Sequence, residues 1–122
     1  VSYIHSESYA AGELKHGTIS LIDEDVPVIA VATQTDIIPK TISNVVEVKS
    51  RGAKVILVCT DACARELKDG VADYVIEIPH TDELLMPITA VVPLQILAYY
   101  TSINRGIDPD KPKNLAKSVT VE

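Results

Sequence analysis

The chain has 122 residues, which is enough for one domain and too few for two. It is 47% hydrophobic and 23% charged, a composition typical of an ordered globular domain. Its net charge of −6 argues against nucleic acid or an anionic membrane as the main partner. The longest apolar region, residues 84–100, is interrupted by Pro87, Pro93 and Gln95, so no run reaches the roughly 18 uninterrupted apolar residues of a membrane helix. These features predict a globular domain that spans no membrane.

The first 22 residues have helical character and contain the cluster GELKHG at residues 12–17. On a helix, Glu13 and His16 are three positions apart, so they are the pair in this cluster that can interact. An imidazole, with an unperturbed pKa of about 6.5, can move protons at physiological pH. The alternative is structural: His16 is then the last residue of a helix, favoured there by the helix dipole, and Gly17 ends that helix.

Three segments are typical of parallel strands: residues 26–33, 53–60 and 72–79. The first two are nearly continuous apolar runs, as in strands covered on both faces, whereas the third alternates and is expected at a sheet edge. Helices are predicted between them, over residues 36–52 and 61–70. Strand–helix–strand units at this spacing imply right-handed crossovers.

Asp61 is the expected N-cap of the helix predicted over residues 61–70. A longer helix is predicted over residues 82–105, with Thr81 as its cap and Gly106 at its end. Pro93 lies deep inside the long helix and predicts a kink or a break. The fold class is therefore α/β, with a parallel, flavodoxin-like three-layer sheet flanked by helices. Because three strands are few for such a sheet, we expect an incomplete domain, the C-terminal portion of a larger polypeptide.

The two cysteines, Cys59 and Cys63, have the spacing C-x-x-x-C and not the C-x-x-C of redox and zinc sites. Cys59 ends a predicted apolar strand, so a buried core thiol is expected. Free thiols indicate a reducing, cytoplasmic compartment. The sequence has no second cysteine pair, no phosphate-binding P-loop and no dinucleotide fingerprint, and we predict no metal and no cofactor.

The last segment, residues 107–122, contains Lys117 within NLAKSVTVE. A tail lysine is most often a solvated charge, but three features favour a role here. Pro109 and Pro112 restrict the backbone, the end of the chain is apolar and β-branched, and small residues, including Ala116, flank the lysine. A lysine that is partly desolvated has a lowered pKa, and its neutral amine can attack a sugar carbonyl to form a Schiff base.

Four segments occur in order along the chain: YIHSESYAAGELKHG, LIDEDVPVIAVA, VPLQILAYY and NLAKSVTVE. Together they resemble the C-terminal part of the glucosamine-6-phosphate synthase family, the isomerising glutamine–fructose-6-phosphate aminotransferases, over essentially the whole chain. Thr18 departs from the pattern, since many members have proline there. The resemblance implies that residues 1–122 are the later part of a second sugar isomerase (SIS) domain, with a catalytic tail over 107–122.

The resemblance also implies residue roles and partners. Lys117 would form the Schiff base with open-chain fructose 6-phosphate, His16 would assist ring opening in the neighbouring subunit's site, and the backbone of Ala116 would contact the sugar. The implied partners are the sugar phosphate, the glutaminase domain and the first SIS domain of the same polypeptide, and a second copy in a homodimer. The proton-transfer glutamate and the phosphate-binding loops are implied to lie outside these residues, so the isolated chain is expected to be inactive.

Two other functions stay open. A non-catalytic SIS module that binds a sugar phosphate in a regulatory protein would need no reactive lysine, and the NLAKSVTVE tail argues against it. A flavodoxin-like interaction or phosphocarrier domain would use Cys59 or Asp61 at the carboxyl end of a strand, where open α/β sheets bind ligands. This second alternative leaves both terminal motifs unexplained.

Overall fold

The computed structural model describes residues 1–111 and residue 113. The described residues divide into two compact units. Residues 7–93 form the first, the sheet unit; residues 1–6 together with the described residues from 94 onward form the second, the tail unit. Ala116 and Lys117, the predicted site residues of the C-terminal tail, lie outside the described residues.

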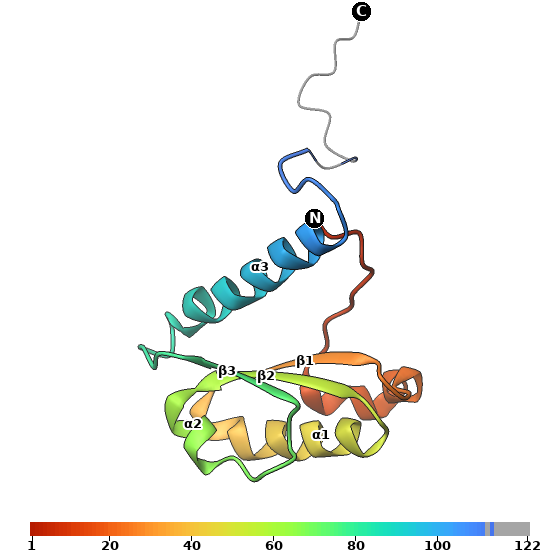
Figure 1. Ribbon diagram of the computed structural model, residues 1–122. Coiled ribbons are helices and arrows are strands. Elements are labelled where there is room, and N and C mark those ends of the chain that lie inside the picture. Colours follow the sequence, from red (N-terminus) through yellow and green to blue (C-terminus); the bar gives the residue numbers. More distant parts are fainter. Residues whose placement is uncertain (112, 114–122) are drawn as a thin grey trace, which may run out of the picture. The chain divides into compact units, whose positions relative to one another are not determined.

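The sheet unit is built on three parallel strands in the order β1-β2-β3 (Figure 1). β1 comprises Pro27–Ala32, β2 comprises Lys54–Thr60 and β3 comprises Tyr74–Ile78. The three predicted strands and their parallel pairing are therefore confirmed. β3 lies at an edge of this sheet, as its alternating pattern predicts, and β1 forms the other edge.

Two helices lie on the same face of the sheet (Figure 1). The 3-10 turn η3, Thr35–Ile37, leads into α1, Ile38–Ser50, as predicted. α2 is shorter than predicted, Asp61–Glu66. The expected N-cap Asp61 is wrong, because the Thr60 Oγ1, one residue earlier, accepts a hydrogen bond from the Cys63 N–H at 3.4 Å and already satisfies a first-turn donor.

The core lies between this helical layer and one face of the sheet. Successive side chains of a strand point to opposite faces, and Val55, Leu57 and Cys59 of β2 all point toward the helices and are completely buried. On the opposite face, Ile29 and Val31 of β1 stay 45% and 40% exposed. The α/β class is confirmed, and the helix-covered face of the sheet carries the main core cluster of the described residues.

The first part of the chain is less helical than expected. The 3-10 helices η1, Ala11–His16, and η2, Thr18–Leu21, confirm helical character there, but the prediction is wrong for residues 1–10, which contain no helix. None of the side chains of residues 1–10 is buried. A helix in this stretch would therefore lack the packed apolar face from which short helices gain most of their stability.

α3 begins later than predicted, at Met86, and ends at Asn104. Residues 82–85 form a turn instead, in which the Met86 N–H donates to the Asp82 carbonyl at 3.0 Å. Thr81 is not the cap: its N–H and hydroxyl both lie near the sulfur of Met86, at 3.4 and 3.3 Å. The caps predicted for both helices are thus displaced by local hydrogen bonds that residue type alone does not reveal.

The C-terminus of α3 follows the prediction. Gly106, with φ 69°, donates to the Ile103 carbonyl, and the Ile107 N–H donates to the Ser102 carbonyl, both at 2.9 Å. This pair of bonds is the Schellman motif, for which glycine is the favoured residue. Of the predicted kink or break at Pro93, the break is wrong, since α3 continues through this residue, and the kink stays a prediction; the boundary between the two units directly follows Pro93.

α3 is also apolar. By length and composition it could cross a membrane, with a mean hydropathy of 1.3 over its 18-residue window, of which 17% is buried. The sequence suggested that the interrupting residues Pro87, Pro93 and Gln95 exclude a membrane span. The composition of α3 shows that these residues alone do not exclude it. A single helix of this kind is weak evidence for a membrane, because core helices of soluble domains share its composition.

Candidate functional site

His16 is the last residue of η1 and its side chain is exposed. The predicted pair with Glu13 does not form, and the imidazole has no hydrogen-bond or ion-pair partner among residues 1–111 and 113. Its neighbour Lys15 instead forms an ion pair with Glu47 of α1 at 2.7 Å. His16 is therefore available to a group from elsewhere, and its role in ring opening stays a prediction.

The backbone on either side of this exposed histidine is anchored in the core. Leu14 packs against the core cluster and Ile19 is buried within it, on either side of His16. Between the two 3-10 helices, Gly17 has φ 148°, a conformation that residues with a side chain rarely adopt. Glycine in the GELKHG cluster thus allows the sharp change of direction that leaves the imidazole on the surface.

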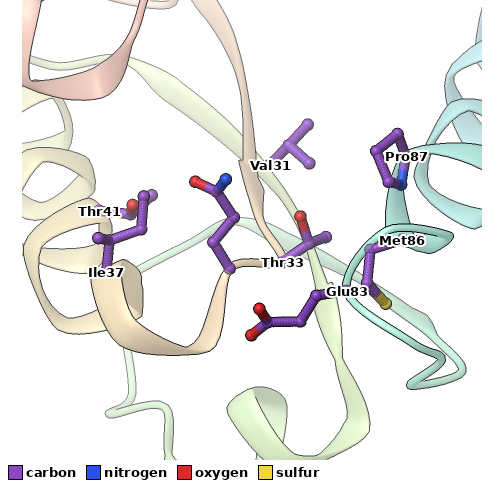
Figure 2. A pocket seen from close by; sticks show the side chains of 8 residues that line it. Val31, Thr33, Ile37, Thr41, Glu83, Met86 and Pro87 are labelled. Carbon is purple, nitrogen blue, oxygen red and sulfur yellow. The ribbon is translucent and has the colours of Figure 1, made fainter.

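A cavity of about 140 Å³ opens at the carboxyl end of β1 (Figure 2). This is the edge of a parallel sheet at which open α/β folds bind ligands. Its lining combines polar and apolar side chains from β1, the β1–α1 connection, α1, the turn before α3 and the start of α3: Val31, Thr33, Gln34, Ile37, Thr41, Glu83, Met86 and Pro87.

The charge of this cavity disfavours a phosphate. Glu83 lines it, Asp36 joins Glu83 in lining an adjoining hollow, and neither lining contains lysine or arginine. Two carboxylates without a cation would repel a sugar phosphate's anionic group. The cavity thus offers hydroxyl and amide groups for a neutral polar molecule.

Cys59 is a buried thiol, as predicted, and Cys63 is buried as well; neither forms a disulfide with the other. Burial raises the pKa of the Cys59 thiol to about 12, with further contributions from the neighbouring Cys63 and from Glu77. A thiol that stays protonated at neutral pH is a poor nucleophile. Asp61, the other residue of the phosphocarrier alternative, forms an ion pair with Arg65 on the surface of α2. Among the described residues, no group of three or more metal-ligating side chains could hold a metal ion.

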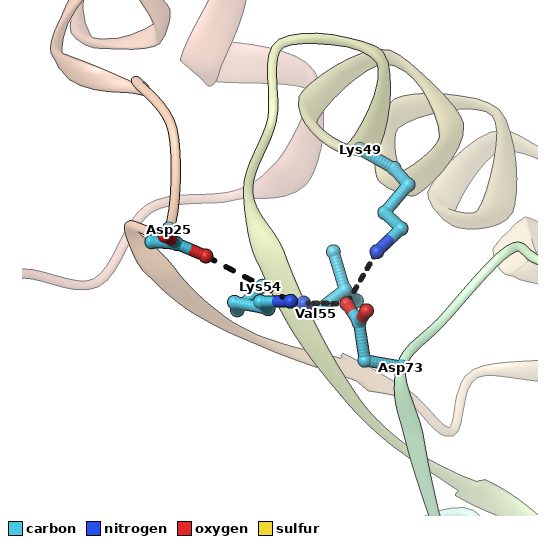
Figure 3. A network of polar contacts seen from close by, with 5 residues as sticks. All are labelled: Asp25, Lys49, Lys54, Val55 and Asp73. Carbon is cyan, nitrogen blue, oxygen red and sulfur yellow. Dashed lines mark hydrogen bonds and ion pairs between the residues drawn. The ribbon is translucent and has the colours of Figure 1, made fainter.

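A polar network lies at the opposite end of the strands from the cavity, where β2 and β3 begin (Figure 3). Oδ2 of Asp73 accepts hydrogen bonds from the Lys49 ammonium at 2.5 Å and from the Val55 N–H at 2.7 Å. These two bonds, that of Lys49 first, lower the pKa of Asp73. The network joins α1 to the segments that enter β2 and β3, so it stabilises the fold and is remote from the carboxyl edge where the cavity lies.

In the tail unit, Lys113 is the described residue nearest to Lys117 in the sequence. Its N–H donates to the Tyr3 hydroxyl oxygen, and its ammonium lies 5.5 Å from the centroid of the Tyr3 ring. Tyr3 was not predictable from the sequence, because no periodicity or spacing signals a contact between residues 110 positions apart. The structure brings together, in the tail unit, the first residues of the chain and the base of the predicted catalytic tail.

The family model of the SIS domain matches residues 1–105, and the chain belongs to this family. The matched range includes α3, which is therefore a helix of the SIS domain. Among individual proteins, the chain is similar to the glutamine–fructose-6-phosphate aminotransferases [isomerizing] of Clostridium perfringens and Thermococcus kodakarensis, at 55% and 50% identity over all 122 residues. It spans 20% of the length of each of these curated relatives.

A solved structure supports the same relationship. The C-terminal domain of glucosamine-fructose-6-phosphate aminotransferase from Francisella tularensis matches with a TM-score of 0.82 and 37% sequence identity. The match covers 88% of this chain and 30% of that one. The resemblance to this family and the SIS-type fold, both expected from the four sequence motifs, are therefore confirmed.

Proposed function

We propose that the chain is the C-terminal portion of the second SIS domain of an enzyme that converts fructose 6-phosphate and glutamine to glucosamine 6-phosphate and glutamate. The observation that carries this proposal is the similarity of all 122 residues, at 50–55% identity, to proteins named as this aminotransferase. That similarity favours the enzyme over the non-catalytic SIS module. The product would supply hexosamine biosynthesis, and the free thiols Cys59 and Cys63 support a cytoplasmic location.

The proposed chemistry centres on Lys117. After ring opening, its neutral amine attacks the C2 carbonyl of fructose 6-phosphate, and water leaves as the Schiff base forms. Ammonia released from glutamine then displaces the lysine, and a proton transfer between C1 and C2 completes the amino aldose. Lysine itself activates the carbonyl in this scheme, so the reaction calls for no metal or cofactor. The backbone of Ala116 would contact the sugar.

His16 would assist ring opening as a proton-transfer group. Its imidazole is exposed and has no hydrogen-bond or ion-pair partner within the described part of the chain, and Leu14 and Ile19 anchor the residues on either side of it in the core; both observations support this role. An exposed group is suited to completing the site of a neighbouring subunit, so the role also entails a homodimer. The other partners, a glutaminase domain and a first SIS domain, would belong to the same polypeptide, and the isolated 122 residues would be inactive.

The test uses the full-length polypeptide and follows glucosamine 6-phosphate and glutamate separately. Lys117→Arg keeps the positive charge but removes the neutral amine, so synthesis of the amino sugar is expected to fall by at least about 1,000-fold while glutamine hydrolysis persists. Lys111→Arg is the matched control in the same tail and should leave both activities unchanged. Normal synthesis by the Lys117→Arg enzyme would remove the proposed role.

A further inference from the structure

Thr41 of α1 has a hydroxyl group that no described residue satisfies. The residue is only 9% exposed and lines the cavity at the carboxyl end of β1. Thr101 and Ser102 of α3 donate their hydroxyls to carbonyls four residues earlier, whereas Thr41 has no hydrogen-bond partner in the described part of the chain. Among these residues, no fully enclosed polar side-chain atom lacks a partner. The unpartnered Thr41 hydroxyl therefore reaches the open space of the cavity, where a ligand can supply its hydrogen bond.

Two carboxylates face the same space. Glu83 lines both the cavity and the adjoining hollow, and Asp36 lines the hollow. The Glu83 side chain extends from the turn before α3 toward the connection between β1 and α1 (Figure 2). Within residues 1–111 and 113, neither carboxylate has a hydrogen-bond or ion-pair partner. The space therefore carries negative charge that no neighbouring protein cation balances.

The start of α1 does not offset this charge. A helix N-terminus attracts anions through its free N–H groups. Here the N–H groups of Ile37 and Ile38 both donate to the Gln34 carbonyl, at 3.0 and 3.1 Å, and Pro39 has no N–H. Lys40, in the same turn, lines neither the cavity nor the hollow. The electrostatics of the space thus favour a cation.

The cation that fits is organic. The described residues contain no group of three or more metal-ligating side chains that could hold a metal ion. Apolar side chains make up half of the cavity lining and suit a carbon skeleton: Val31, Ile37, Met86 and Pro87. The cavity and the hollow measure about 140 and 220 Å³, which limits the ligand to a small molecule.

We propose that the cavity and the hollow together, the β1-end site, bind a small hydroxylated amine, the class to which unphosphorylated amino sugars belong. The ammonium group lies beside Glu83 and Asp36, and a ligand hydroxyl forms a hydrogen bond with the Thr41 hydroxyl. The hydroxyl and amide groups of the lining alone would suit a neutral polar molecule, and the two carboxylates add the preference for a positive charge. The inference goes beyond the proposed function, because it concerns a different ligand and does not depend on Lys117.

The expected contributions are modest, because both carboxylates are exposed. One exposed ion pair changes an affinity about 2- to 5-fold, and one hydrogen bond changes it about 2- to 10-fold. The charge of the ligand should therefore matter by about 4- to 25-fold when both carboxylates take part. A dissociation constant on the order of 1 mM is expected for a ligand of this size.

The experiment titrates the full-length polypeptide, labelled with ¹³C at its methionine methyl groups, at pH 6.5 and low salt. Met86 is the only methionine of the 122 residues and lines the cavity, so its methyl signal reports binding there; Met86→Leu assigns that signal. The probe is glucosamine, which carries one ammonium and several hydroxyls on a small ring. Glucose is the neutral comparison, because a hydroxyl replaces the ammonium at nearly the same size.

Glucosamine should shift the Met86 signal and bind about 4- to 25-fold more tightly than glucose. The double variant Glu83→Gln, Asp36→Asn should lower the affinity for glucosamine to that for glucose and leave glucose unaffected. Thr41→Val should weaken both sugars about 2- to 10-fold, whereas Thr41→Ser keeps the hydroxyl and should bind like the wild type. Glu66→Gln is the matched charge control, since this glutamate is exposed on α2 and lines neither space, and it should change nothing.

Three results would overturn the inference. The first is an unshifted Met86 signal at about 20 mM glucosamine, where a site with a dissociation constant of about 1 mM would be about 95% occupied. The second is equal affinity for glucose and glucosamine, or a preference for glucosamine that survives the double variant, since either removes the carboxylates from recognition. The third is unchanged binding by Thr41→Val. Failure of the proposed function is separate, because a Lys117→Arg enzyme should bind glucosamine at the β1-end site like the wild type.

Discussion

Leu57 and Leu84 give a direct test of where the core lies. Leu57, at the centre of β2, is 0% exposed and faces the helical layer, whereas Leu84, in the turn before α3, is 89% exposed. Replacing Leu57 with alanine removes three buried carbons, worth about 2.4 kcal/mol at roughly 0.8 kcal/mol each, and leaves a cavity. The total loss should be about 3 to 4 kcal/mol, within the roughly 2.7–5.0 kcal/mol range of buried leucine-to-alanine changes.

Leu84→Ala is the matched control, because it makes the same chemical change at an exposed position and should alter stability by less than about 0.5 kcal/mol. The measurement is equilibrium unfolding in urea, followed by far-UV circular dichroism. With a slope of about 1.5 kcal/mol per molar urea, Leu57→Ala should lower the midpoint by about 2 M and Leu84→Ala by less than about 0.4 M. Equal shifts for the two variants would refute the assignment of the core to this face of the sheet.

Three further predictions concern the helix end, the polar network and the exposed histidine. Gly106→Ala should destabilise the chain by about 1 to 2 kcal/mol because φ is 69° at this position; the added Cβ itself meets no atom within 4 Å. Gly12→Ala is the control, since this position is equally open but has no positive φ, and it should cost less in the same urea assay. Asp73→Asn should destabilise the chain at neutral pH, because the folded-state pKa of Asp73 lies below its unfolded value of about 3.9. The difference in stability from wild type should shrink as the pH falls below about 4. A difference that persists there would contradict the ion pair's role. His16→Gln in the full-length enzyme should slow amino-sugar synthesis by about 100-fold or more, whereas His80→Gln, in an exposed loop, should leave the rate unchanged.

The strands were predictable because two of them are nearly continuous apolar runs and the third alternates between apolar and polar residues. Val55, Leu57 and Val58 belong to one such run, and the structure buries all three completely. Helix ends were less predictable, since they depend on individual hydrogen bonds. Thr60 takes the cap expected at Asp61, and the sulfur of Met86 occupies the donors of Thr81. Such choices between neighbouring polar groups are settled by geometry and not by residue type.

The candidate site was predictable only in part. The structure agrees with the alternative in which His16 ends a helical segment before Gly17, and the interaction that its spacing from Glu13 allowed does not form among the described residues. Periodicity holds information about neighbours along one element, whereas Tyr3 and Lys113 meet across 110 positions. Local sequence features pointed to Lys117 as a possible Schiff-base amine, whereas the specific roles of Lys117 and Ala116 came from the resemblance of NLAKSVTVE to a family, and these roles stay predictions.

The central claim is the covalent role of Lys117, and reductive trapping tests it most directly. The full-length polypeptide is incubated with fructose 6-phosphate in the absence of glutamine, reduced with borohydride, digested and mapped by mass spectrometry. Borohydride converts a Schiff base to a stable secondary amine, so the sugar phosphate should be found on Lys117 and not on Lys111 or Lys113 of the same tail. Absence of an adduct, or an adduct only on another lysine, would contradict the account.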